Sequence, residues 1–210
     1  MKNELLPTKF PGISDNVYTG FGPRIAAKII DFIVLLPVVG LLLYINGLSK
    51  SAYFYAVVPN LLFGIWFEVY LVKRYGGTPG KLMMGIKIIK NNGADVDWRA
   101  AFYRYSVELF LAILGVYVMI LTLNLIDDNT YISLGFMKRN QLIATLNPIP
   151  GKVHSWLNAL WVVTGLIVLV SDRRKRSTHD FIAGTVVIKS IFLDKIRETI
   201  NYSTTDEVEL

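Results

Sequence analysis

Long apolar stretches separated by short polar segments dominate the sequence. Four of them are close to the length of a membrane-spanning helix: 25–45, 52–72, 102–125 and 155–171. A helix rises about 1.5 Å per residue, so about 20 apolar residues cross a hydrocarbon core roughly 30 Å thick. The pattern therefore predicts four membrane-spanning helices, of which the last is the shortest.

Composition agrees with a chain embedded in a lipid bilayer. Of its 210 residues, 53% are hydrophobic and 18% are charged, which leaves too little polar surface for a water-soluble globule. The absence of cysteine excludes disulfides, thiolate metal sites and cysteine nucleophiles. We expect no cofactor and no metal.

Basic residues are distributed unevenly between the two sides of the predicted bundle. Alternate connections place 18 Lys and Arg residues on one side and 4 on the other. Because Lys and Arg are retained on the cytoplasmic side, we expect both termini in the cytoplasm and the protein in the cell (inner) membrane. The net charge of +6 then indicates contact with anionic lipid headgroups, not with nucleic acid. The predicted lipid anchor follows the fourth stretch and comprises Arg173, Arg174 and Lys175.

Charged residues within or beside the apolar stretches are the strongest functional candidates. A carboxylate inside a membrane is costly unless it faces protein, water or a cation. The predicted charge network comprises Arg24, Lys28, Asp31, Glu68, Arg104 and Glu108. Because Arg24, Lys28 and Asp31 share one helical face, Asp31 is expected to pair on its own helix. The network predicts either an ion path or static support.

Two short segments of similar pattern follow the second and fourth stretches. In the first, Thr78 caps a short interfacial helix that ends at Gly85, and IKII and ADV then form a small hairpin. In the second, HDFIAGTVVIK aligns with KLMMGIKIIK, so that Gly184 matches Gly85. The alignment predicts a 2+2 parallel repeat about a pseudo-twofold axis along the membrane normal.

The remaining segments are predicted to lie outside the bundle. Residues 1–22 form a loosely held lead, 23–190 the transmembrane domain, and 191–210 a polar, mobile tail. The external segment 126–154 has no convincing helical periodicity and is expected to be a packed cap. The fold class is an all-α membrane protein: a four-transmembrane-helix bundle with short interfacial helices and small cytoplasmic β segments.

The basic segment after the fourth stretch contains further polar candidates. Asp180 is expected to pair with Arg176, four residues earlier. His179 is interpreted as a capping or interfacial residue. His154 lies on the opposite side of the membrane in this topology, so the two histidines cannot bind one metal ion.

Three ordered motifs resemble the RDD family of bacterial membrane proteins: FGPRIAAKIIDFIV, GGTPGKLMMGIKIIKNNG and RKRSTHDFIAGTVVI. The resemblance extends over about 18–189. It implies that Arg24, Asp31 and Asp180 are the residues for which the family is named. It also implies that the motif residues are Arg24, Asp31, Gly80, Lys81, Gly85, Arg176, His179 and Asp180. The chain departs from the family in its long segment before the fourth helix and in its extended tail.

Two functions of different kinds follow from the resemblance and from the charges. Some family members are linked to sodium/proton antiport, which implies cation transport through the intramembrane carboxylates, in a homodimer that provides room for alternating access. Other members resemble accessory factors, which implies a non-enzymatic scaffold that binds another membrane protein or anionic lipid. An enzyme is not expected.

Overall fold

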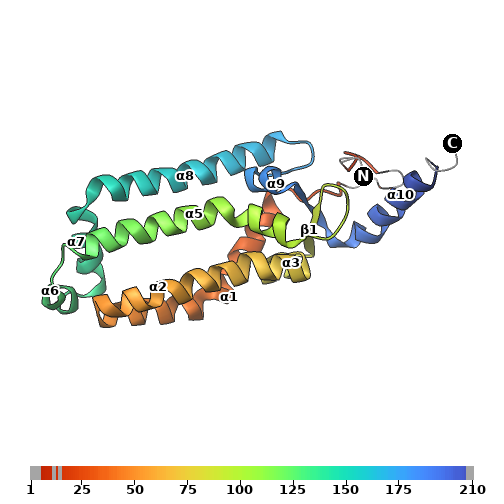
Figure 1. The fold of residues 1–210 in the computed structure, drawn as a ribbon. Helices are drawn as coiled ribbons and strands as arrows, with labels where there is room; N and C mark the ends of the chain where they lie inside the picture. The colour runs from red at the N-terminus through yellow and green to blue at the C-terminus, as the bar shows by residue number, and fades with distance from the viewer. Residues whose placement is uncertain (1–5, 11–12, 14–15, 207–210) are drawn as a thin grey trace. The chain divides into compact units, whose positions relative to one another are not determined.

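Long helices make up most of the structure. The computed structural model describes residues 6–10, 13 and 16–206. In that part of the chain, four segments are long and apolar enough to span a membrane, as Figure 1 shows along the chain: α1 (Phe21–Leu48), Lys50–Met83, α5 (Trp98–Leu123) and α8 (Pro148–Ser171). The prediction of an all-α membrane protein with four long apolar helices is confirmed. The fourth helix begins earlier than the predicted position 155.

The second span is a series of helical segments. The α-helix α2 (Lys50–Ile65) continues into the π-helical turn η1 (Trp66–Tyr70) and into α3 (Leu71–Tyr75). Gly76 ends α3 in the left-handed conformation (φ 81°), which a glycine adopts without steric cost. The short helix α4 (Pro79–Met83) follows, with a proline in its first turn.

Contacts between residues divide the chain into two compact units. The first unit comprises 1–34, 67–105 and 164–210, and the second comprises 35–66 and 106–163. Each long helix contributes residues to both units.

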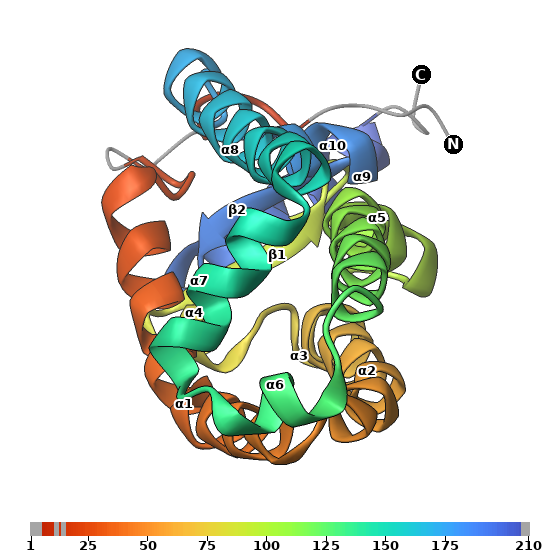
Figure 2. The same cartoon turned by 90° about the vertical axis from the view of Figure 1, so that its left-hand side faces the viewer.

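A two-stranded antiparallel sheet lies in the first unit. Strand β1 (Ile86–Lys90) pairs with β2 (Thr185–Lys189), which follows the short helix α9 (Thr178–Ala183), and Figure 2 shows the two strands side by side. The hairpin predicted within 86–96 is represented by the bridge between Ile89 and Asp95. The prediction of β segments is correct, but the main partner of β1 was wrong.

Segments from both ends of the sequence pack against this sheet. Leu6 and Phe10 are buried with Ile89 of β1, and with Ile196 of the C-terminal helix α10 (Leu193–Asp206). The turn η2 (Ser190–Phe192) connects β2 to this helix. We call the described residues of 6–19, 76–97 and 172–200 the strand module. For the described residues, the predictions of a loosely held lead and of a mobile tail were wrong, because Leu6, Phe10 and Ile196 cover apolar faces of the strands. The parts of these predictions that fall on 1–5, 11–12, 14–15 and 207–210 lie outside the described residues.

The segment 126–154, predicted to be a packed cap without convincing helical periodicity, contains two short helices in the second unit. They are α6 (Asp128–Ser133) and α7 (Phe136–Leu146). From α6, the Tyr131 hydroxyl donates to the carbonyl oxygen of Asn46 at 2.7 Å, and from α7 the guanidinium of Arg139 donates to the same oxygen at 3.1 Å. Lys50 forms an ion pair with Asp128 at 2.9 Å. These bonds fix the segment to the end of α1 and the start of α2.

Apolar side chains point outward along the spans. Tyr55 is 83% exposed, Leu62 60% and Trp156 74%. A water-soluble protein rarely exposes so much contiguous apolar surface, whereas a bilayer provides an apolar environment for it. The exposed faces of the long helices α1, α2, α5 and α8 are therefore the surfaces that contact lipid.

Substitution of Ile196 tests whether α10 is an integral part of the strand module. Ile196 is fully buried, so Ile196→Ala is expected to remove about 2–5 kcal/mol of packing free energy and to release α10. Limited proteolysis of the purified protein should then cut within α10 faster than in the wild type. Ile191→Ala, at an 81% exposed position, is the matched control and should have no effect. Equal cleavage of Ile196→Ala and the wild type would show that α10 is not held by this contact.

Candidate functional site

One carboxylate receives bonds from two arginines in the first unit. Asp180 of α9 is fully buried, and its Oδ2 accepts a hydrogen bond from Nη1 of Arg24, near the start of α1, at 2.7 Å. Its Oδ1 is paired with the guanidinium of Arg104 in α5. Arg104 also donates to the hydroxyl of Thr185 at 2.9 Å. The predicted pairing of Asp180 with Arg176 was wrong, because Arg176 pairs with Asp172 at 3.0 Å instead.

Asp180 also caps its own helix. Its Oδ2 accepts from the backbone N–H of Ser177 at 2.9 Å and from the Ser177 hydroxyl at 2.8 Å, which completes a capping box. Burial by itself would raise the pKa of Asp180, but the neighbouring guanidinium groups of Arg104 and Arg24 outweigh it and hold that pKa well below its usual range. Asp180 is therefore a permanent anion at physiological pH.

Asp31 of α1 caps the short helix α4, to which it does not itself belong. Its Oδ1 accepts from the backbone N–H of Gly80 at 2.7 Å, and its Oδ2 accepts from the Thr78 hydroxyl at 2.6 Å. Asp31 is 7% exposed, so both bonds are shielded from water. A Cβ atom at position 80 would collide with the backbone oxygen of Ala27 and with Asp31, which explains why glycine occupies this position. The expected partners of Asp31 were wrong: Arg24 binds Asp180, and Lys28 is exposed on α1.

The two short helices and their strands correspond position by position. Gly85 and Gly184 end the helices with the same left-handed backbone, φ 64°. The N–H of Ser190 donates to the carbonyl of Gly85, and the N–H of Asn91 donates to the carbonyl of Gly184. At the offset that superposes the glycines, Ile88 corresponds to Val187, and these two residues lie opposite each other in the sheet. This register is what a twofold repeat would produce, and it supports the repeat proposed from the sequence.

The correspondence breaks down at one charged position. Lys81 of α4 occupies the place that Asp180 occupies in α9. Its Nζ lies 3.3 Å from the Thr78 hydroxyl, and its charge is within electrostatic range of both Glu68 and Asp31. Glu68 is half-buried in the π-helical turn η1. Glu108, half-buried in α5, belongs to the second unit, whereas Glu68 belongs to the first.

His179 lies beside the arginine-bound carboxylate and contacts the capping serine. Its Nε2 is 2.8 Å from the hydroxyl of Ser177. Burial, followed by the positive charge of Arg104, lowers the pKa of His179 well below 6.5, although the nearby Asp180 acts in the opposite direction. His179 is therefore neutral at pH 7. Its role as a polar support for the cap agrees with this geometry.

The predicted lipid anchors differ in their contacts. Arg174 donates from Nε to the carbonyl oxygen of Leu6 at 2.7 Å, and Lys175 donates to the carbonyl oxygen of Val170 at 3.1 Å. Arg173 is exposed within the strand module. Two of the three predicted lipid anchors, Arg174 and Lys175, thus bind backbone carbonyl oxygens of this chain.

Sequence reasoning missed several polar residues of this site. Ser177, Thr185 and the carbonyl oxygen of Lys175, which accepts from Arg24 at 2.5 Å, all contact the arginine-bound cluster. The spacing of a serine followed three residues later by an acid is a helix-capping signal that could have identified Ser177. Over the residues with a described structure, no three His, Asp or Glu side chains converge as a metal site requires.

The pH dependence of stability tests the half-buried position of His179. The pKa of His179 is lowered in the folded state, so the unfolded chain binds a proton at this histidine at a higher pH than the folded protein does. The difference begins to matter as the pH falls through about 6.5. Each pH unit below that value should cost up to about 1.4 kcal/mol of unfolding free energy. Asp180 should add no loss in this range, because its lowered pKa preserves its contribution until the pH falls below about 4.

Thermal unfolding in detergent at pH 7.5 and pH 5.5 measures this effect. The wild type should melt at a lower temperature at pH 5.5, and His179→Gln should lose most of that difference. His154→Gln, in the second unit, is the control and should retain it. An equal pH effect in the wild type and in His179→Gln would contradict the assignment.

Comparison with known proteins agrees with the motifs that surround this site. The pattern of the RDD family matches residues 18–184, which is most of the chain. No curated protein and no solved structure is found to match. The matched range includes Arg24, Asp31, Arg104 and Asp180, whose side chains anchor the two short helices. This protein therefore belongs to the RDD family and is a membrane protein with four long apolar helices.

Proposed function

We propose that the protein is a non-enzymatic membrane scaffold or accessory factor that binds another membrane protein. The observation that carries this proposal is that fixed donors within the first unit occupy both family-motif carboxylates, Asp31 and Asp180. A carboxylate that exchanges a cation for a proton must bind and release each of them in turn. Asp31 and Asp180 instead cap short helices, whose N-terminal dipoles favour a negative charge.

The surface supported by these caps is suited to a protein partner. The helices α4 and α9 expose apolar side chains: Met83 is 71% exposed, Phe181 46% and Ile182 44%. The excess of basic residues beside the strand module favours its location on the cytoplasmic side of the cell membrane. A membrane protein that approaches in the plane of the bilayer would meet these helices at the membrane surface.

Site-specific photocrosslinking in native membranes tests the scaffold proposal. A photoreactive residue at position 83 or at position 181 should yield an adduct with the same protein from both positions, identified by mass spectrometry after affinity purification. Leu62 and Trp156, which are exposed on the spans, are the control positions and should yield lipid adducts. Recovery of only lipid or self adducts from positions 83 and 181 would contradict the proposal.

Cation/proton exchange is a second candidate, and Glu68 is the residue that favours it. Glu68 lies within a membrane span, in a π-helical turn, and such turns occur often at functional sites. It interacts with the charge of Lys81, whose nearest hydrogen-bond partner is the Thr78 hydroxyl at 3.3 Å. Glu68, and not Asp31, is thus the carboxylate that would carry such an exchange, in a homodimer that provides room for alternating access.

Sodium-dependent proton exchange in everted membrane vesicles separates the two candidates. If the protein is a scaffold, vesicles that contain the wild type should show no exchange above vesicles without it. Exchange that is present in the wild type and lost in Glu68→Gln would instead establish the second candidate. Glu198→Gln, at an exposed position on α10, is the matched control and should behave as the wild type in either case.

A further inference from the structure

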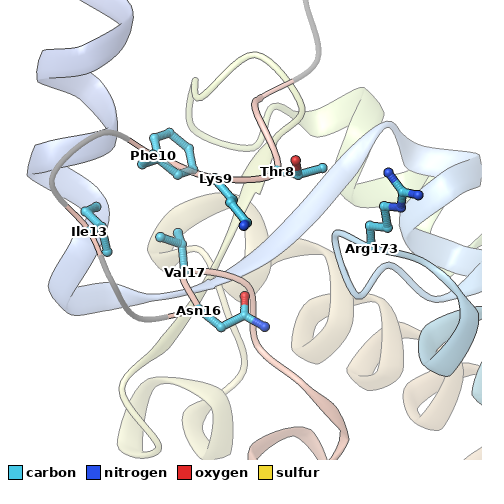
Figure 3. Close-up of a pocket in the computed structure, with 7 residues that line it drawn as sticks. All are labelled: Thr8, Lys9, Phe10, Ile13, Asn16, Val17 and Arg173. Atoms are coloured by element: carbon cyan, nitrogen blue, oxygen red, sulfur yellow. The ribbon is translucent and has the colours of Figure 1, made fainter.

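A cavity of about 730 Å³ opens between the N-terminal segment and the connection that follows α8. Figure 3 shows Lys9 and Arg173 on either side of it, from segments far apart in the sequence. Phe10, Ile13 and Val17 form its apolar lining. A volume in this range is typical of a pocket for a small ligand.

The two cations of the cavity are available to an anionic ligand. Both Lys9 and Arg173 are exposed, and among residues 6–10, 13 and 16–206 neither has an ion-pair partner. Asn16 contributes an amide to the same lining. By contrast, Arg174 is engaged with a backbone carbonyl, and Arg176 with Asp172. Only Arg173 of these three arginines faces the cavity.

Hydrogen bonds hold the two walls of the cavity together. Nε of Arg174 donates to the carbonyl oxygen of Leu6 at 2.7 Å, which joins the connection after α8 to the N-terminal segment. The Tyr18 hydroxyl donates to the carbonyl oxygen of Pro7 at 2.5 Å. Phe10 and Val17 are each only 4% exposed, because they also belong to the core of the strand module. The backbone segments that carry Lys9 and Arg173 are therefore held next to each other by the fold.

The cavity adjoins the ends of two membrane spans, where the membrane surface is expected. Val17 shortly precedes α1, and Arg173 directly follows the end of α8, so both walls are adjacent to ends of membrane spans. A ligand with a negative headgroup and an apolar body would match the two cations and the apolar lining. Lipids of this kind are present at that depth at high local concentration.

We propose that this cavity binds the phosphoglycerol headgroup of an anionic phospholipid. The phosphate lies between Lys9 and Arg173, the amide of Asn16 faces the glycerol hydroxyls, and the apolar lining meets the start of the acyl chains. The site differs from the basic run predicted from the sequence, since it needs Lys9 from the N-terminal segment. It is also independent of the protein partner proposed above, whose binding surface is on α4 and α9.

Binding of fluorescently labelled phosphatidylglycerol to the full-length protein in neutral detergent micelles tests this site. The wild type should bind phosphatidylglycerol more tightly than labelled phosphatidylcholine. A Lys or Arg near an anionic lipid surface contributes about 1 kcal/mol, so Lys9→Gln and Arg173→Gln should each weaken binding about fivefold, and the double variant about 25-fold. The charge-preserving pair Lys9→Arg and Arg173→Lys should bind as the wild type does.

Two controls distinguish a specific lipid site from general attraction to surface charge and from a site for a soluble phosphate. Lys195→Gln removes one exposed cation on α10 and should leave binding unchanged. Free glycerol 3-phosphate should not displace the labelled lipid at equal concentration. The proposal is overturned if phosphatidylcholine binds equally, if Lys195→Gln weakens binding as much as Lys9→Gln, or if glycerol 3-phosphate competes equally. None of these results would affect the crosslinks expected at positions 83 and 181.

Discussion

The structure of the first unit depends on one buried carboxylate held between two guanidinium groups. Removal of charges from water costs several kcal/mol per ion, and this cost is recovered only when the geometry is good and the remaining hydrogen bonds are made. Asp180 meets that condition, because each of its oxygens accepts from an arginine and Oδ2 also accepts from Ser177. Loss of one partner from such a buried pair costs about 3–5 kcal/mol. One side chain thus fixes the starts of two spans to a short helix.

Several features of this arrangement could be predicted from local sequence patterns. Apolar length identified the four long helices, since a bilayer imposes a minimum span. A glycine after a short apolar run identified the ends of α4 and α9, where Gly85 and Gly184 adopt a left-handed backbone. The ordered motifs identified the RDD family. In each case the determining residues are close together in the sequence.

Pairings between distant segments could not be predicted in this way. Helical spacing suggested Arg176 as the partner of Asp180, but Arg24 and Arg104 approach it from other helices, and no local pattern encodes that approach. The apolar residues near the N-terminus were interpreted as a loose lead because their partner surface, the β1–β2 sheet, was not foreseen. The error at the C-terminal helix α10 was of a different kind, because its sequence does contain a local signal. Ile196 and Ile200 are four residues apart, so they lie on one face of a helix, and this spacing indicates a helix with an apolar face.

The pairing of β1 with β2 constrains the order in which the protein can be made. The ribosome synthesises β2 about 100 residues after β1, which at roughly 5–20 residues per second is a delay of about 5–20 seconds. The third and fourth spans must enter the membrane during this interval. Until β2 emerges, the edge of β1 has no permanent strand partner, and such an edge invites pairing with other chains. Completion of the sheet is therefore among the last steps of biogenesis, and a nascent chain stalled before β2 would be a substrate for chaperones and quality-control proteases.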